Sequence, residues 1–152
     1  MAMQFTGSRG VLSYTDGIAA SSSDGLMLVG RCCVAAVFFM TAWSASPTAG
    51  YLGSLGVPNP GLFSSVAIVV EYLVALSLIL GIATRYGALL GIAYVIVATV
   101  LAHRYWQYPA AQQVAQYTNF LKNIAIFGGL LFVFVSGGGR ISVDRSLAEK
   151  KR

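Results

Sequence analysis

Residues 62–83 read LFSSVAIVVEYLVALSLILGIA, an apolar stretch that contains a single charged residue, Glu71. About 20 apolar residues are enough for a helix to cross a hydrocarbon core of ~30 Å. Three further apolar stretches lie at 26–45, 86–102 and 119–136. The whole chain is 57% hydrophobic and only 10% charged, whereas soluble domains are roughly 25% charged. The sequence therefore predicts an all-α integral membrane protein built as a four-helix bundle.

The segments outside these four stretches are too short to form a second domain. We expect a polar tail over residues 1–25, in which residues 21–24 (Ser-Ser-Ser-Asp) supply the N-cap of the first membrane helix. The transmembrane domain then covers 26–144, and a basic tail follows over 145–152.

The connections between the predicted spans differ in character. Residues 46–61 are rich in proline and glycine and carry no charge, so we expect this segment to fold back over the mouth of the bundle as a lid. Thr84 and Arg85 form a tight turn, which makes the second and third spans antiparallel neighbours. Pro109 is placed to begin a short interfacial helix over 110–117.

The basic residues are distributed unevenly over the predicted loops. One side carries Arg9, Arg85, Arg140, Arg145, Lys150, Lys151 and Arg152. The other side carries Arg104 and Lys122. Because short cytoplasmic loops collect Lys and Arg, we expect both termini to be cytoplasmic. Topology and contact with membrane lipids account for the net charge of +5, and no basic stripe predicts a nucleic-acid partner.

Small residues in the third span form the step Gly87-Ala88-Leu89-Leu90-Gly91, which lets helix backbones approach closely. One interpretation is close packing within the bundle, and the other is a homo-oligomer contact through Gly87 and Gly91. Cys32 and Cys33 are adjacent, so on a helix they point about 100° apart. They are interpreted as small apolar fillers rather than a redox pair.

Ionisable residues inside the apolar stretches are the candidate functional residues. A charge at the centre of a bilayer costs about 2.5–3.5 kcal/mol on insertion scales, so it needs a partner or a role. Glu71 lies near mid-depth, Arg31 near one end of the first span and Lys122 near the opposite end of the fourth. We expect Glu71 to be ion-paired with these two cations in one polar core. Such a core either fixes the helix register or binds a polar headgroup.

Three neighbouring polar residues complete the candidate site. Asn119 and Asn123 frame Lys122 and can donate hydrogen bonds to a ligand carbonyl, and His103 closes the third span. The chain has one histidine, so it cannot by itself hold a haem or a metal cluster. We therefore expect no metal site and no intrinsic cofactor.

Several short motifs occur in a characteristic order along the chain. They are Gly30-Arg31, Tyr51-Leu52-Gly53-Ser54-Leu55-Gly56-Val57-Pro58, Glu71 before Leu80-Gly81-Ile82-Ala83-Thr84-Arg85, His103, Asn119-Phe120-Leu121-Lys122-Asn123, and Gly137-Gly138-Gly139-Arg140-Ile141-Ser142-Val143-Asp144. This pattern resembles the DoxX-like family of small four-helix bacterial membrane proteins over roughly residues 26–144. At the position of Gly138 many members carry a proline.

The resemblance implies a multi-pass protein of the bacterial cytoplasmic (inner) membrane that works with a protein subunit of a redox complex. The family is named for a subunit associated with thiosulfate:quinone oxidoreductase, and its members are generally called oxidoreductases or accessory subunits. Our first hypothesis is that a quinone or similar amphipathic molecule binds near Glu71 and Lys122, with Glu71 as a proton relay. The alternatives are a structural anchor without ligand chemistry, and an oligomeric transporter of protons or a small solute. Catalytic residues stay unassigned.

Overall fold

The computed structural model describes residues 11–44 and 48–150, with side chains from residue 14 onward. In chain order the elements are α1 (Val11–Trp43), α2 (Thr48–Ser54), α3 (Pro60–Leu80), α4 (Thr84–Ala102), the 3-10 helix η1 (Tyr105–Gln107), α5 (Ala110–Ser136) and α6 (Val143–Lys150). Four of these helices, α1, α3, α4 and α5, are long and apolar enough to cross a membrane. The predicted all-α bundle of four spans is confirmed.

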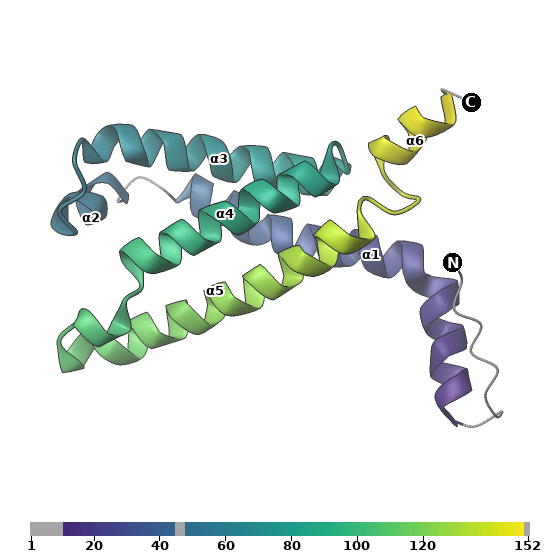
Figure 1. Cartoon of the computed structure of the whole chain (residues 1–152), viewed down its shortest axis with the longest axis horizontal. Helices are drawn as coiled ribbons and strands as arrows, with labels where there is room; N and C mark the ends of the chain where they lie inside the picture. The colour runs from purple at the N-terminus through teal and green to yellow at the C-terminus, as the bar shows by residue number, and fades with distance from the viewer. Residues whose placement is uncertain (1–10, 45–47, 151–152) are drawn as a thin grey trace.

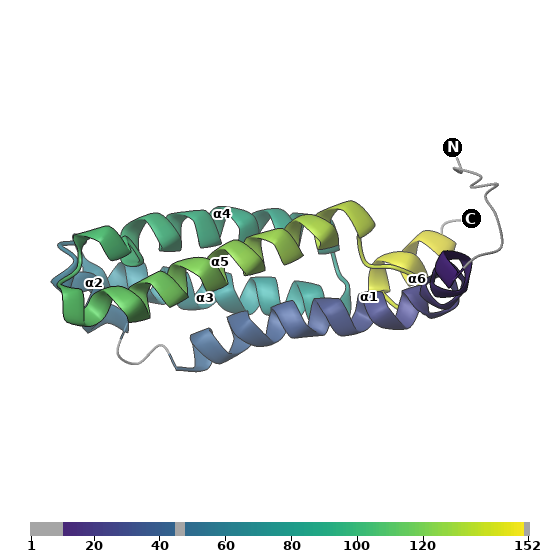
Figure 2. The ribbon, with the colours of Figure 1, turned by 90° about the horizontal axis from the view of Figure 1, so that it is seen from below.

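The four long helices pack in a ring (Figures 1 and 2). α1 packs on α3, α3 on α4, α4 on α5, and α5 returns to α1. Their shared core consists of Ala35, Phe38, Val74, Ala75, Leu78, Ala88, Val95, Leu130 and Val133. We call the two ends of the bundle the α2 end, where α2 and η1 lie, and the α6 end, where α6 and the start of α1 lie. Which end faces the cytoplasm stays a prediction.

The first helix begins much earlier than the sequence indicated. Residues 11–25 are helical and continuous with the first span, so the predicted N-cap at residues 21–24 is wrong. Ser21 and Ser23 donate their hydroxyls to the carbonyls of Ile18 and Ala20, 3.0 and 3.1 Å away, one turn back within a continuing helix. This first part of α1 bends away from the bundle axis, as its Gly- and Ser-rich sequence favours.

The last span also begins early. α5 is one helix from Ala110, so the predicted separate interfacial helix over 110–117 is instead its first part. Pro109 does start this helix, since its carbonyl accepts the N–H groups of Gln112 and Gln113. Polar residues of the first turns did not break the helix because none of them is a glycine or a proline. After α5, the described part of the expected basic tail, residues 145–150, belongs to a short helix, α6.

The turn between α3 and α4 makes these helices antiparallel neighbours, as predicted, but it lies at residues 81–83. Thr84 and Arg85 already belong to α4. Gly81 and Ala83 adopt left-handed conformations, with φ of 66° and 48°. An alanine in this region is strained, so other contacts have to hold the turn in place.

Asp144 supplies those contacts from the far end of the chain. Its carboxylate accepts hydrogen bonds from Ala83 N at 2.7 Å, Thr84 N at 2.9 Å and Thr84 Oγ1 at 2.8 Å. Its own N–H donates to the Gly81 carbonyl at 2.9 Å. Asp144 therefore caps α4 and ties the residues before α6 to the α3–α4 turn.

The described part of the predicted connection, residues 48–61, folds back onto the bundle, whereas residues 45–47, with Pro47, lie outside the described residues. A role of this segment as a lid stays a prediction. Within it α2 packs on α3. The Tyr51 hydroxyl donates to the Ala102 carbonyl at 2.6 Å and lies 2.7 Å from the Tyr108 hydroxyl. These bonds anchor α2 to the end of α4.

The small-residue step of α4 faces the interior of the bundle. A Cβ placed on Gly87 would collide with Ser77 of α3, and one on Gly91 would touch Val74 and Leu130 at 3.2 and 3.1 Å. Close packing within the bundle is thus confirmed. In the single chain α3 and α5 cover both glycines, and a homo-oligomer contact stays a prediction.

Candidate functional site

Glu71 lies in the middle of α3 and is buried, with 7% of its surface exposed. The Tyr94 hydroxyl of α4 donates to its Oε1 at 2.6 Å, a length typical of a hydroxyl bound to a carboxylate. The Thr41 hydroxyl of α1 lies near the same carboxylate but donates to the Val37 and Phe38 carbonyls, both 3.0 Å away. The Tyr94 hydroxyl of the neighbouring helix α4 is therefore the main partner of this acid among the described residues.

The expected ion pairs of Glu71 are wrong. Among the described residues no Lys or Arg nitrogen lies within 4.0 Å of its carboxylate. Arg31 instead reaches toward the α6 end, where its Nη2 donates to the Ile141 carbonyl at 2.7 Å. Lys122 is exposed on α5, which packs on α4 and α1 rather than on α3. The three ionisable residues do not form one core.

Tyr94 is the partner that the sequence interpretation missed, although the sequence does contain a signal for it. In an antiparallel helix pair, residues equally distant from the turn lie level with each other. Ser77 meets Gly87 and Val74 meets Gly91 in this way across the turn at 81–83. The same register places residue 94 opposite Glu71.

Arg31 belongs to a separate cluster at the α6 end and is 1% exposed. Its guanidinium contacts the place where a Cβ of Gly81 would be, so the glycine makes room for it. Burial by itself would raise the pKa of Asp144. The hydrogen bonds from Thr84 and Ala83 and the positive charge of Arg31 outweigh this effect and hold the pKa of Asp144 below its usual range.

Asn123 lies at a groove between α4 and α5. Its Nδ2 donates to Thr99 Oγ1 at 2.8 Å, and that hydroxyl donates to the Val95 carbonyl at 2.6 Å. The groove has a volume of about 270 Å³ and is lined by Val95, Ile96, Thr99, Val100, Phe120, Asn123, Ile124 and Phe127. Asn123 and Thr99 are thus the two polar side chains of an otherwise apolar lining.

The remaining predicted site residues lie apart from Glu71. His103 ends α4, and its Nδ1 lies 2.8 Å from Gln116 Oε1 of α5. Asn119 is partly exposed and does not line the groove. Near His103, burial and then the neighbouring Tyr108 hydroxyl raise the pKa of Tyr51 to about 12. The structure therefore separates the predicted site into the Glu71–Tyr94 pair, the Asn123 groove, the Arg31 cluster and the polar contacts of the α2 end.

Comparison with known proteins gives three similarities. The DoxX family model matches residues 26–104. The Inner membrane protein YphA of Escherichia coli (strain K12) is 35% identical over 124 residues, which cover 79% of this chain and 89% of that protein. The Inner membrane protein YqjF of the same strain is 29% identical over 131 residues, 82% of this chain and 93% of that protein. No solved structure matches. This chain therefore belongs to the DoxX family and is a multi-pass protein of the inner membrane.

Proposed function

We propose that this protein is a membrane subunit that binds a quinone or similar amphipathic ring molecule and presents it to a redox partner. The observation that carries the proposal is the apolar groove between α4 and α5 with the Asn123 amide at its wall. A quinone needs an apolar slot for its ring and tail and a hydrogen-bond donor for a carbonyl. This groove combines both features within the described part of the chain.

The walls of the groove suit a flat ring with a lipid tail. Phe120 is held by edge contacts with Tyr105 and Trp106, at centroid distances of 5.6 and 6.2 Å, and so offers a fixed aromatic surface. Ile96, Val100 and Ile124 are 49%, 59% and 52% exposed. Because these residues face outward from the bundle, a ligand enters from the lipid and leaves its tail there. A volume of about 270 Å³ suits a headgroup rather than a whole lipid.

The polar chemistry of the groove rests on Asn123. A primary amide has two N–H donors and one carbonyl acceptor. One N–H is used by Thr99, and no described residue engages the second or the carbonyl oxygen. Because Thr99 fixes the amide, its second N–H is available to a ligand carbonyl at little cost in side-chain entropy. Lys122, the neighbouring residue, is exposed and does not line the groove.

Glu71 acts as a proton relay in the proposed function. Its bond to Tyr94 joins two groups that can each hold or release a proton. The pair lies on the α3 side of α4, whereas the groove lies on the α5 side. Ligand binding and proton relay are therefore separable: substitution of Asn123 tests the first, and substitution of Glu71 tests the second.

The experiment measures the quinone that stays with the protein. The full chain is purified gently from bacterial membranes, and the retained quinones are quantified by mass spectrometry. We expect Asn123→Ala to lower retention about tenfold, as the loss of one well-placed hydrogen bond implies. Asn119→Ala is the matched control, since it removes an amide one turn away that does not line the groove. Equal retention in both variants, or no quinone on the wild type, contradicts the proposal.

The structural-anchor alternative makes a different prediction. Glu71→Gln keeps the size of the side chain and removes its ability to give up a proton. If the variant assembles with its partner and the activity of the complex is unchanged, Glu71 only fixes helix register. Transport is tested by solute and proton flux in reconstituted vesicles, where the proposed function predicts no flux.

A further inference from the structure

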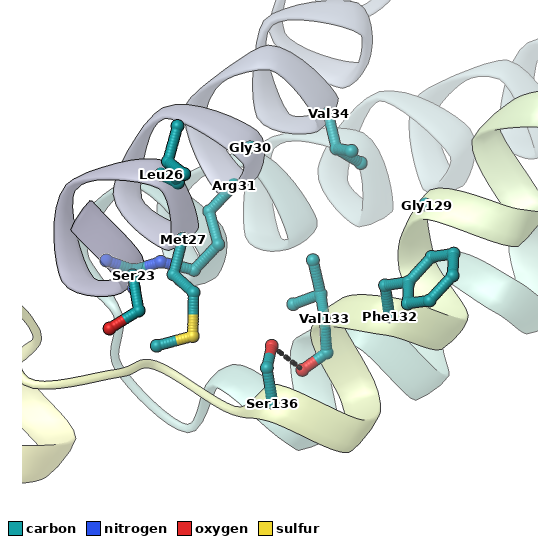
Figure 3. Close-up of a pocket in the computed structure, with 10 residues that line it drawn as sticks. All are labelled: Ser23, Leu26, Met27, Gly30, Arg31, Val34, Gly129, Phe132, Val133 and Ser136. Carbon is teal, nitrogen blue, oxygen red and sulfur yellow. Dashed lines mark hydrogen bonds between the residues drawn. The ribbon is translucent and has the colours of Figure 1, made fainter. Parts of the chain in front are cut away.

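We propose that a second groove, between α1 and α5 at the α6 end, binds an anionic phospholipid whose phosphate is held by the buried guanidinium of Arg31. This groove is separate from the Asn123 groove and has a volume of about 470 Å³. Figure 3 shows its lining, which comes from α1 on one side and α5 on the other. It consists of Ser23, Leu26, Met27, Gly30, Arg31, Val34, Gly129, Phe132, Val133 and Ser136.

The guanidinium of Arg31 has unused hydrogen-bonding capacity. Its Nη2 donates to the Ile141 carbonyl at 2.7 Å, whereas its Nε and Nη1 are buried and have no partner among the described residues. A charged donor that is buried and unpaired is costly and indicates a missing acceptor. Asp144 is the nearby acid, but its oxygens accept from Ala83 and Thr84, and it makes no ion pair with Arg31 within 4.0 Å.

Met27 lies beside Arg31 in the lining of the groove. In Figure 3 the stem of Arg31 runs along the wall, and its guanidinium passes behind Met27. The Met27 methyl packs where a Cβ of Gly139 would lie, so Met27 fills the space between α1 and the residues that follow α5. Methionine has three rotatable bonds and repacks readily, so we expect a change of its rotamer to give a ligand in the groove access to Arg31.

The chemistry of the lining selects the ligand. A guanidinium offers parallel N–H donors that match the oxygens of a phosphate. The rest of the groove is mainly apolar and extends along α5 past Val133 and Phe132 to Gly129, which suits an acyl chain. Arg140 lies 3.8 Å from Asp24, the residue after Ser23 of the lining, and its side chain is 81% exposed, so we expect its charge to be available to an anionic headgroup. A free phosphate would leave the apolar part of the groove empty.

The test fills the groove without touching Arg31. A Cβ on Gly30 meets no atom within 4 Å, so Gly30→Leu occupies the groove in a helix that tolerates leucine. Gly128→Leu is the matched control, because Gly128 is equally unobstructed, lies in a span and does not line the groove. Arg31→Lys is a further variant that keeps the charge and loses the planar fork.

Binding is measured by native mass spectrometry of the full chain with added phosphatidylglycerol or phosphatidylcholine. We expect the wild type and Gly128→Leu to retain phosphatidylglycerol in preference, and Gly30→Leu and Arg31→Lys to lose about tenfold or more of this retention. Unchanged retention in Gly30→Leu overturns the proposal. Equal retention of the two lipids overturns the anionic assignment, and displacement by millimolar inorganic phosphate overturns the assignment to a lipid.

Discussion

Asp144 ties the residues before α6 to the α3–α4 turn, so its removal should lower the free energy of unfolding. Asp144→Ala leaves the N–H groups of Ala83 and Thr84 and the fully buried Thr84 hydroxyl without their acceptor. Loss of an N-cap costs about 0.5–2 kcal/mol, and each further lost bond to a charged group about 1 kcal/mol or more. Since Asp144 is partly exposed, water can hydrogen-bond to some of the freed groups and offset part of this loss of stability. We therefore expect Asp144→Ala to lower the free energy of unfolding by about 2–3 kcal/mol.

The assay is reversible unfolding of the purified chain in mixed micelles, followed by circular dichroism. Asp24→Ala is the matched control, because its 3.8 Å pair with the exposed Arg140 is worth only about 0–1 kcal/mol. If Asp144→Ala destabilises the chain no more than Asp24→Ala, the Asp144 carboxylate does not hold the turn.

The pKa of Asp144 is lower in the folded state than in the unfolded state. Its contribution to the free energy of unfolding is therefore fully present above the unfolded pKa of ~3.9 and is lost as the pH falls through the folded pKa. The difference in unfolding free energy between the wild type and Asp144→Ala should disappear in that acidic range. Gly81→Ala places a methyl group against Arg31 and 2.5 Å from Ser142 Cβ, at a φ of +66°, so we expect it to destabilise the chain by several kcal/mol. The control Gly56→Ala has a φ of +76° but no atom within 4 Å of the new methyl group, so we expect it to cost only about 1–2 kcal/mol. Equal losses of stability in the two variants would contradict the packing of Arg31 against Gly81. Tyr94→Phe removes the hydroxyl that donates to Glu71, so we expect it to lower the free energy of unfolding by about 1–3 kcal/mol. The control Tyr72→Phe keeps the ring contact with Phe39 and should cost less. Comparison of the two unfolding free energies checks this.

The spans and their order could be predicted from the sequence, because hydrophobic length decides them. The pairing of Glu71 with Tyr94 could also have been predicted, since the helix hairpin fixes which residues lie level. The expectation of cations around Glu71 failed for a physical reason. Arg31 and Lys122 were expected as partners because a buried carboxylate is stabilised by a nearby cation. Helix packing instead directs Arg31 toward the α6 end and leaves Lys122 exposed on α5.

Two other features were out of reach of the sequence. The serines at 21–23 are typical N-cap residues, yet the helix continues through them, because their hydroxyls can also bond to carbonyls of the preceding turn. The capping of α4 by Asp144 joins residues 60 positions apart. Local sequence propensity cannot predict such a contact, because the contact depends on the path that residues 137–143 take between α5 and α6.

The groove beside Asn123 is proposed to hold a quinone-like ring. Photolabelling tests it most directly: a photoreactive azido-quinone is added to membranes that contain the full chain, and the labelled residues are identified by peptide mass spectrometry. We expect labels in residues 95–100 of α4 and 120–127 of α5, and a loss of these labels in Asn123→Ala. Labels spread evenly over the lipid-facing helices, or concentrated on α1 and α3, would contradict it.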